Sequence, residues 1–115
     1  DKNLDFLISV FKMRLMKIIG FAPSVNECVC CKIKENLTGF SFKDNGFKCE
    51  NCGKQDASVF GLTQATKNAI IYSTKVDSKK IFSFDLSEKS LKEFEIVSRL
   101  YLNEKLEKEY NLEKY

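Results

Sequence analysis

The chain contains the segments Cys28-Val29-Cys30-Cys31 and Cys49-Glu50-Asn51-Cys52, each of which holds a pair of cysteines with two residues between them. The 17 residues from Lys32 to Lys48 separate the two pairs. Two C-x-x-C pairs separated by roughly 15–20 residues are typical of zinc sites. Each pair lets a tight turn present two sulfurs to one ion, and a chain reversal between them brings the second turn to the same ion. The pattern predicts a zinc site with four ligands, Cys28, Cys31, Cys49 and Cys52.

Cys30 leaves one alternative open in the ligand set. A Cys28-x-Cys30 pair can replace Cys28-x-x-Cys31, as in the zinc sites of redox-regulated chaperones, although the C-x-x-C spacing favours Cys31. In the favoured set, Cys30 is a small and partly buried apolar residue. Reduced buried thiols or adventitious disulfides are the alternative to a metal site.

The predicted zinc is structural rather than catalytic. A catalytic zinc keeps one position open for water, whereas four thiolates fill the tetrahedron. The chain contains no His that could carry protons, no glycine-rich phosphate loop and no nucleophile elbow. We therefore expect one structural Zn²⁺ ion, no catalytic residues and no enzymatic activity.

Residues 24–60 differ in pattern from the segments on either side, because helical periodicity stops there. Phe40-Ser41-Phe42 alternates, and Asn45-Gly46 then precedes Phe47, which is a pattern typical of a β-hairpin. Gly53 follows the second cysteine pair and suits a left-handed backbone, whereas Lys32 follows the first pair and suits it less well. The segment is predicted to be a zinc module with a β-hairpin, inserted between helices.

The segment Leu4 to Ile19 reads as a helix that is apolar on two sides, and Gly20 and Pro23 predict its end. The strip formed by Phe6, Val10 and Met13 is expected either to face an absent N-terminal domain or to pack on another helix of this domain. The wider apolar stripe comprises Leu4, Leu7, Ile8, Phe11, Leu15, Ile18 and Ile19.

Two further helices are expected after the zinc module. Thr63 can cap a helix of about 12 residues, a short turn follows near residues 77–82, and Ser87 precedes a helix from Glu88 to about Glu109. The tail from Leu106 to Tyr115 is expected to fray. The predicted fold is a mainly α, single domain over residues 1–115. The second helix is expected to bury Leu91, Phe94, Val97 and Tyr101.

Composition narrows the class of protein. The 115 residues carry a formal net charge of +3, which permits an anionic partner without demanding one. No apolar run reaches the ~18 residues of a membrane span, and five cysteines without a signal peptide favour the cytoplasm, where disulfides are rare. Because the sequence begins with Asp1, we expect it to be a fragment of a longer protein.

The sequence resembles the C-terminal domain of the bacterial RecO family. The resemblance rests on Phe11-Lys12-Met13-Arg14-Leu15 and Gly20-Phe21-Ala22-Pro23 ahead of the first cysteine pair, and it continues through Phe40-Ser41-Phe42, Gly46 and the second pair. Phe84-Asp85-Leu86-Ser87 before the last helix also fits. The chain departs from the family at Lys32, where Gly is common, and at the additional thiol of Cys30.

The resemblance implies a mediator of DNA repair and homologous recombination that binds and anneals single-stranded DNA and helps to load the recombinase. Its implied partners are single- and double-stranded DNA, RecR and the C-terminal tail of single-strand-binding protein, with neither a membrane nor a small-molecule substrate. It also implies an upstream OB-fold domain that this chain lacks, and a place near the nucleoid. The candidate phosphate contacts are Lys12, Arg14, Lys17, Lys48 and Lys54.

Two other functions stay open at this point. The zinc hairpin can be a module that only docks a protein partner. It can also be a redox switch, in which Cys30 attacks the site under oxidation and releases the metal.

Overall fold

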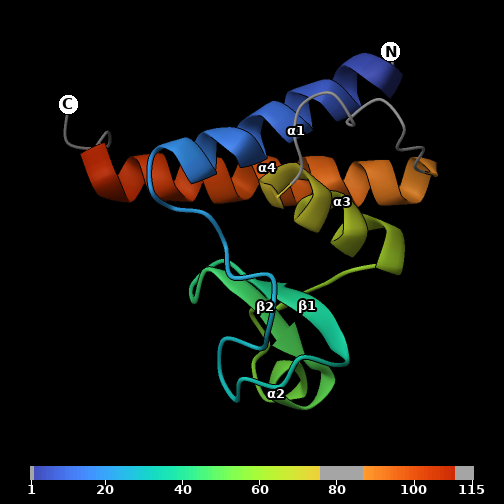
Figure 1. Ribbon diagram of the computed structural model, residues 1–115, viewed down its shortest axis with the longest axis vertical. Coiled ribbons are helices and arrows are strands. Elements are labelled where there is room, and N and C mark those ends of the chain that lie inside the picture. The colour runs from blue at the N-terminus through green and yellow to red at the C-terminus, as the bar shows by residue number, and fades with distance from the viewer. Residues whose placement is uncertain (1, 76–86, 111–115) are drawn as a thin grey trace.

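The computed structural model describes residues 2–75 and 87–110 of the chain. Three helices form one layer: α1 (Lys2–Ile18), α3 (Gln64–Lys75) and α4 (Glu88–Tyr110). A small sheet and the short helix α2 (Glu50–Lys54) form a second body beside this layer (Figure 1). The expected mainly helical class is confirmed, with the hairpin lying between α1 and α3 in the sequence. Within the described ranges, no helix is both long and apolar enough to span a membrane.

Helix α1 packs on α4 and α3 through the narrower of its two apolar faces. Val10 and Met13 are almost completely buried together with Met16, and the Phe6 ring lies 5.8 Å from the Phe94 ring of α4, centroid to centroid. The strip of Phe6, Val10 and Met13 therefore meets helices of this same domain. The expectation that this strip faces an absent domain is wrong.

The wider predicted stripe of α1 lies on the opposite side and is largely open. Its side chains retain 54% exposure at Leu4, 43% at Ile8, 66% at Phe11 and 78% at Ile18. Both faces are apolar in sequence, so only the partner helices decide which one becomes core.

Helix α3 begins at its predicted cap, Thr63, and α4 begins directly after Ser87, as expected. The Thr66 amide donates to Thr63 Oγ1 at 3.3 Å, and the Ser90 amide donates to Ser87 Oγ at 3.2 Å. These bonds satisfy amides that the first turn of a helix leaves without a helical partner. The predicted core stripe of α4, Leu91, Phe94, Val97 and Tyr101, is buried as expected. The turn predicted near residues 77–82 lies outside the described residues.

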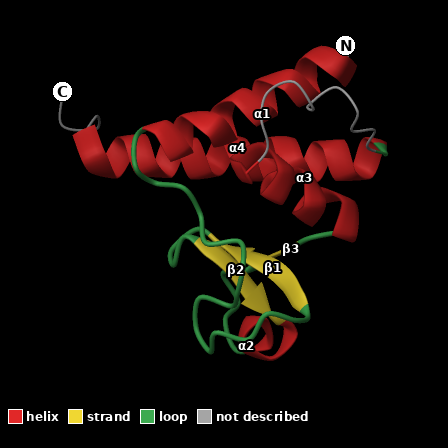
Figure 2. Ribbon diagram, in the orientation of Figure 1, coloured by secondary structure: helices red, strands yellow, loops and turns green. Residues whose placement is uncertain are grey.

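The sheet has three antiparallel strands in the order β2-β1-β3 (Figure 2). They are β1 (Leu37–Ser41), β2 (Gly46–Cys49) and β3 (Phe60–Gly61). The predicted hairpin joins β1 to β2, with Ser41 opposite Gly46. Asn45 takes the left-handed conformation at the end of its loop, with φ of 62°. Neither β3 nor α2 was expected from the sequence.

The segment around Ser24, which leads into the zinc module, lies directly against Gly46 of β2. The Ser24 amide donates to the Asn45 carbonyl at 2.8 Å, and the Phe47 amide donates to the Ser24 carbonyl at 2.9 Å. A Cβ on Gly46 would lie 2.5 Å from that Ser24 oxygen. The absence of a side chain at Gly46 therefore lets these two hydrogen bonds hold the Ser24 segment against the hairpin.

Tyr101 of α4 joins the helical layer to the sheet. Its ring meets Phe40 of β1 edge to face at 5.3 Å between centroids, and its hydroxyl donates to the Phe21 carbonyl at 2.6 Å. One turn later, Lys105 Nζ donates to the Phe42 carbonyl at 3.0 Å. These contacts fix the sheet, and with it the cysteine cluster, on the helices.

Candidate metal centre

The sulfur atoms of Cys28, Cys31, Cys49 and Cys52 lie within 4.8 Å of one another. Cys31 Sγ and Cys49 Sγ, which come from different cysteine pairs, are 3.7 Å apart. Tetrahedral zinc with Zn–S bonds of ~2.3 Å requires sulfurs about 3.8 Å apart. The donor set and its spacing therefore fit one zinc ion, and the fold brings together the four cysteines that the sequence singled out.

The first cysteine pair lies in a tight turn ahead of β1. The Lys32 amide donates to the Cys28 carbonyl at 3.0 Å, and the Cys28 amide donates to the Ile33 carbonyl at 2.8 Å. Lys32 holds φ of 70°, in the left-handed region. A residue with a Cβ therefore occupies the position where the turn requires a positive φ.

The second cysteine pair spans the junction of β2 and α2. Cys49 is the N-cap of α2, and its sulfur accepts the Cys52 amide at 3.4 Å. Gly53 lies inside α2, and its φ is not positive. The expectation that Gly53 supplies a left-handed backbone is wrong, because the chain continues into a helical turn here.

Burial and hydrogen bonds shift the pKa values of Cys28 and Cys52 in opposite directions. Burial by itself raises the pKa of Cys28, but backbone amides of Cys31, Cys49 and Cys30 outweigh it and lower this pKa to about 6. The bond with the Cys49 thiol and burial raise the pKa of Cys52 well above its ordinary value. Zinc binds thiolates, so the lowered pKa of Cys28 favours binding of a metal ion by the cluster.

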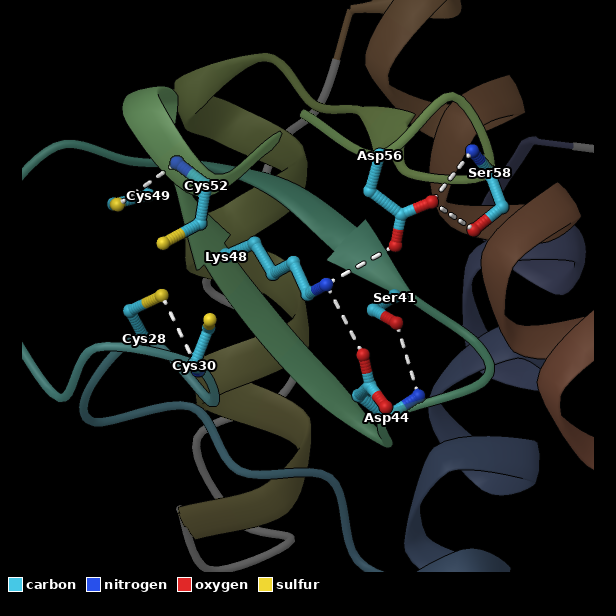
Figure 3. Close-up of polar contacts among 9 residues, drawn as sticks. All are labelled: Cys28, Cys30, Ser41, Asp44, Lys48, Cys49, Cys52, Asp56 and Ser58. Carbon is cyan, nitrogen blue, oxygen red and sulfur yellow. Dashed lines mark hydrogen bonds and ion pairs between the residues drawn. The ribbon is translucent and has the colours of Figure 1, made fainter. Parts of the chain in front are cut away.

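Cys30 lies beside the cluster rather than within the group of four. Its amide donates to Cys28 Sγ at 3.4 Å, and its thiol contacts Cys52 and helps to raise the pKa of Cys52. Figure 3 shows the sulfurs of Cys28, Cys30 and Cys52 pointing into the same region. The Cys30 side chain is exposed. The geometry favours Cys31 as the ligand and leaves Cys30 as a neighbouring thiol.

Lys48 does not fit its predicted role as a DNA contact. The residue is only 7% exposed, and its ammonium binds Asp44 and Asp56, each at 3.0 Å (Figure 3). The other oxygen of Asp56 accepts from the Ser58 hydroxyl at 2.7 Å. Sequence reasoning missed this role because Asp56 reaches Lys48 only through the loop after α2.

The remaining candidate phosphate contacts do not form one patch. Lys17 and Lys54 are exposed, whereas Lys12 and Arg14 are partly buried. Lys54 lies on α2 at the far end of the sheet from α1, and it pairs with Glu50 at 3.4 Å (Figure 1). The predicted contacts are thus divided between α1 and the zinc module.

The amino-acid sequence of the chain is similar to that of known proteins over nearly its whole length. The family described as "Recombination protein O C terminal" matches residues 1–113. A DNA repair protein RecO of Acetivibrio thermocellus is 33% identical over 96% of this chain and 44% of its own length. The RecO of Thermoanaerobacter sp. strain X514 is 31% identical over 90% of this chain and 42% of its own length.

The RecO of Bacillus subtilis is 27% identical over 87% of this chain and 39% of its own length. The chain thus spans less than half the length of these relatives. No solved structure is a significant match. The match over residues 1–113 shows that the chain belongs to the RecO family of DNA repair proteins and corresponds to the C-terminal part of that family.

Proposed function

We propose that this chain is the zinc-stabilised C-terminal part of a recombination mediator that binds single-stranded DNA. The observation that carries the proposal is the family match over residues 1–113. The four-cysteine cluster supports it, because a closed thiolate site can fold a small module without adding chemistry of its own. Annealing of strands and loading of a recombinase belong to the same proposal, as activities of the longer protein.

DNA contact is assigned to the exposed lysines of both bodies. Lys17 on α1 and Lys54 on α2 offer mobile ammonium groups to phosphates, and Lys12 lies on the same helix as Lys17. Arg14 is partly buried and makes a smaller contribution. A single strand is flexible enough to follow cations that do not form one rigid patch.

Binding to a labelled oligothymidylate, followed by fluorescence anisotropy over a salt series, tests this assignment. Lys17→Gln and Lys54→Gln should each weaken binding and reduce the slope of log affinity against log salt by about 0.7. Lys92→Gln is the matched control, because Lys92 is an exposed lysine of α4 outside the candidate set. If the chain shows no binding at low salt, this region does not contact DNA.

The zinc assignment is tested by metal analysis of the purified chain. One zinc per chain is expected, and Cys31→Ser should lose it whereas Cys30→Ser keeps it, since Cys30 lies outside the group of four. The reverse pattern would move the first ligand pair to Cys28-x-Cys30. The measured zinc content also distinguishes a filled metal site from four reduced thiols without metal.

Protein partners are part of the proposal. RecR and the tail of single-strand-binding protein are assigned as partners of the longer protein, and an OB-fold is assigned upstream of this chain. The tail is acidic with an apolar end, so its site needs an apolar groove with Lys or Arg at the rim. Calorimetric titration with such a peptide, against a control peptide lacking the apolar end, tests whether this chain holds that site.

A redox-switched zinc site is the second candidate function, favoured by the exposed thiol of Cys30 beside Cys28 and Cys52. Hydrogen peroxide would oxidise the Cys30 thiol to a sulfenic acid and be reduced to water. A neighbouring ligand thiolate would then attack that sulfur, form a disulfide, release hydroxide and free the metal. Peroxide should release zinc from the native chain but not from Cys30→Ser. Zinc retained by the native chain would exclude the switch.

A further inference from the structure

The dipeptide Asn45-Gly46 joins the hairpin loop to β2, and the fold restricts which residue fits at each of its two positions. Asn45 holds φ of 62°, in the left-handed region that Asn and Gly tolerate better than other residues. A Cβ on Gly46 would lie 2.5 Å from the Ser24 carbonyl oxygen and 2.7 Å from Val29 Cγ1. The backbone geometry therefore favours Asn followed directly by Gly.

Asn followed by Gly is chemically labile. The backbone nitrogen of the Gly attacks Cγ of the Asn, ammonia leaves, and a cyclic succinimide forms. Water then opens the ring to an aspartyl residue, or to an isoaspartyl residue in which the main chain runs through the side-chain carbons. Gly favours the attack because it has no side chain to obstruct it and leaves the peptide free to rotate. The reaction needs only water, without an oxidant, a reductant or an enzyme.

The closed hairpin holds the dipeptide in a geometry that opposes this attack. The Ser24 amide donates to the Asn45 carbonyl at 2.8 Å, and the Phe47 amide donates to the Ser24 carbonyl at 2.9 Å, so the peptides on both sides of Gly46 are fixed. Gly46 is buried. Asn45 Oδ1 is also buried and has no hydrogen-bond partner among the described residues. The Gly46 nitrogen can reach Asn45 Cγ only after the Ser24 segment moves away.

The predicted zinc site holds the segment that covers the dipeptide. The amide of Val29, the residue after Cys28, donates to the Phe47 carbonyl at 2.9 Å, and β2 itself ends at Cys49. A metal ion shared by Cys28 and Cys49 therefore ties together the two segments that enclose the dipeptide. Loss of the metal removes this tie and raises the population of molecules in which the hairpin is open.

Either product would prevent the hairpin from closing as before. An isoaspartyl residue lengthens the main chain and displaces the carbonyl that accepts from Ser24. An aspartyl residue places a charged carboxylate where the buried Oδ1 has no partner among the described residues. We propose that Asn45 is a modification site that loss of zinc opens, and that its deamidation makes the loss of zinc irreversible. This inference rests on the zinc site of the proposed function and is independent of DNA binding.

Peptide mapping by mass spectrometry tests the proposal on the 115-residue chain, incubated under reducing conditions with zinc or with a strong chelator. Deamidation of Asn45 should be at least about tenfold faster without zinc, because a reaction of the open state follows the population of that state. Asn51 is the internal control, because it lies in the same module but precedes Cys52 rather than Gly. Asn51 should stay largely intact in both samples.

Two results of this experiment would overturn the proposal, and metal analysis of the same samples separates them. Equal rates at Asn45 in a zinc-loaded and a zinc-free sample would overturn this inference and leave the zinc site standing. A chain that binds no zinc would overturn the zinc site and this inference together.

Recovery of zinc binding tests the consequence of the modification. Asn45→Gly keeps a residue that tolerates the left-handed backbone but has no side-chain amide to lose. After a long incubation without zinc, zinc and fresh reductant are added and the bound metal is measured. The native chain should recover only part of its zinc content, in proportion to the intact Asn45 that mapping finds, whereas Asn45→Gly should recover all of it. Equal losses in both proteins would overturn the claim that Asn45 makes zinc loss irreversible.

Discussion

Lys32 holds a left-handed backbone conformation directly after Cys31, with φ of 70°. This conformation costs a residue with a Cβ ~1–2 kcal/mol. Replacement by Gly removes that cost, but the larger unfolded-state entropy of Gly cancels part of the gain in stability. We expect Lys32→Gly to raise the free energy of unfolding of the zinc-loaded chain by about 1 kcal/mol, measured by urea denaturation. Its long ion pair with Glu27, at 3.8 Å on an exposed side chain, contributes little.

Lys34→Gly is the control for Lys32→Gly. Lys34 is also exposed, but its φ is not positive. Gly there should lower stability by roughly 0.5–1 kcal/mol through unfolded-state entropy alone. Equal effects of the two substitutions would mean that the first cysteine turn carries no backbone strain.

Lys48, which precedes Cys49 in the chain, supports the hairpin through its ion pairs with Asp44 and Asp56. We expect Lys48→Met to destabilise the chain at pH 7 by about 1–2 kcal/mol, because it leaves Asp44 and Asp56 close together without their cation. Lys54→Met is the matched control, since it breaks only the exposed pair with Glu50 and should cost under about 0.5 kcal/mol. Urea denaturation of the zinc-loaded proteins measures both effects.

The pH dependence of the Lys48 cluster follows from two opposite shifts. Bonds from Ser58 and Lys48 hold the pKa of Asp56 far below its ordinary value, so its stabilisation exists above about pH 4 and is lost as pH falls through the depressed pKa. The carboxylates of Asp56 and Asp44 raise the pKa of Lys48, so its stabilisation is complete below about pH 10 and is lost above that. At pH 7 both groups are charged. A larger effect of Lys48→Met in acid than at pH 7 would contradict this account.

At the scale of elements, the β1–β2 hairpin depends on the close approach of residues 24 and 46. A Cβ on Gly46 would meet the Ser24 carbonyl at 2.5 Å and Val29 Cγ1 at 2.7 Å. We expect Gly46→Ala to destabilise the zinc-loaded chain by about 2 kcal/mol or more and to weaken zinc binding in a competition titration. Gly61→Ala, where nothing lies within 4 Å of the new Cβ, should change neither quantity. Equal tolerance of both substitutions would show that the crossing segment can move away.

The elements differ in how far the sequence predicts them. The cap at Thr63 and the two cysteine turns were predictable, because a cap bond or a C-x-x-C turn involves residues close together in the chain. Helix α2 was missed because it has five residues and its N-cap is a cysteine, Cys49, whose sulfur acts as the cap acceptor. Strand β3 was missed because two residues show no alternation.

The orientation of α1 shows the limit of periodicity. Both of its faces satisfy the helical pattern, and the wider one was the natural candidate for the core. The narrower face is the one that becomes buried, because Phe6, Val10 and Met13 lie on it and Phe6 packs on Phe94 of α4. That information lies more than 70 residues away in the chain. The buried position of Lys48 has the same cause, since Asp56 comes from a loop that the pattern does not place.

At the scale of the whole molecule, two bodies meet along a narrow seam. One core cluster runs through both bodies. The helices contribute Val10, Met13, Phe94 and Val97 to it, and the sheet and cysteine turns contribute Phe40, Phe47, Cys28 and Cys49. Tyr101 and Lys105 bridge the two bodies. The sheet strands have five, four and two residues, and a sheet this small has little apolar surface to stabilise it alone. The metal is expected to supply the missing stability of the sheet.

Removal of zinc should therefore unfold one body before the other. With a strong chelator under reducing conditions, we expect amide protection to be lost in β1 and β2 and kept in α1 and α4, measured by hydrogen exchange with mass spectrometry. Cys31→Ser should show the same pattern without chelator, and added zinc should restore protection only in the native chain. Loss of protection in both bodies together would mean that the Phe40–Tyr101 contact couples them into one cooperative unit. Full protection after metal removal would mean that the hairpin folds without zinc, since Phe40, Phe47 and the Ser24 crossing would then suffice to hold it.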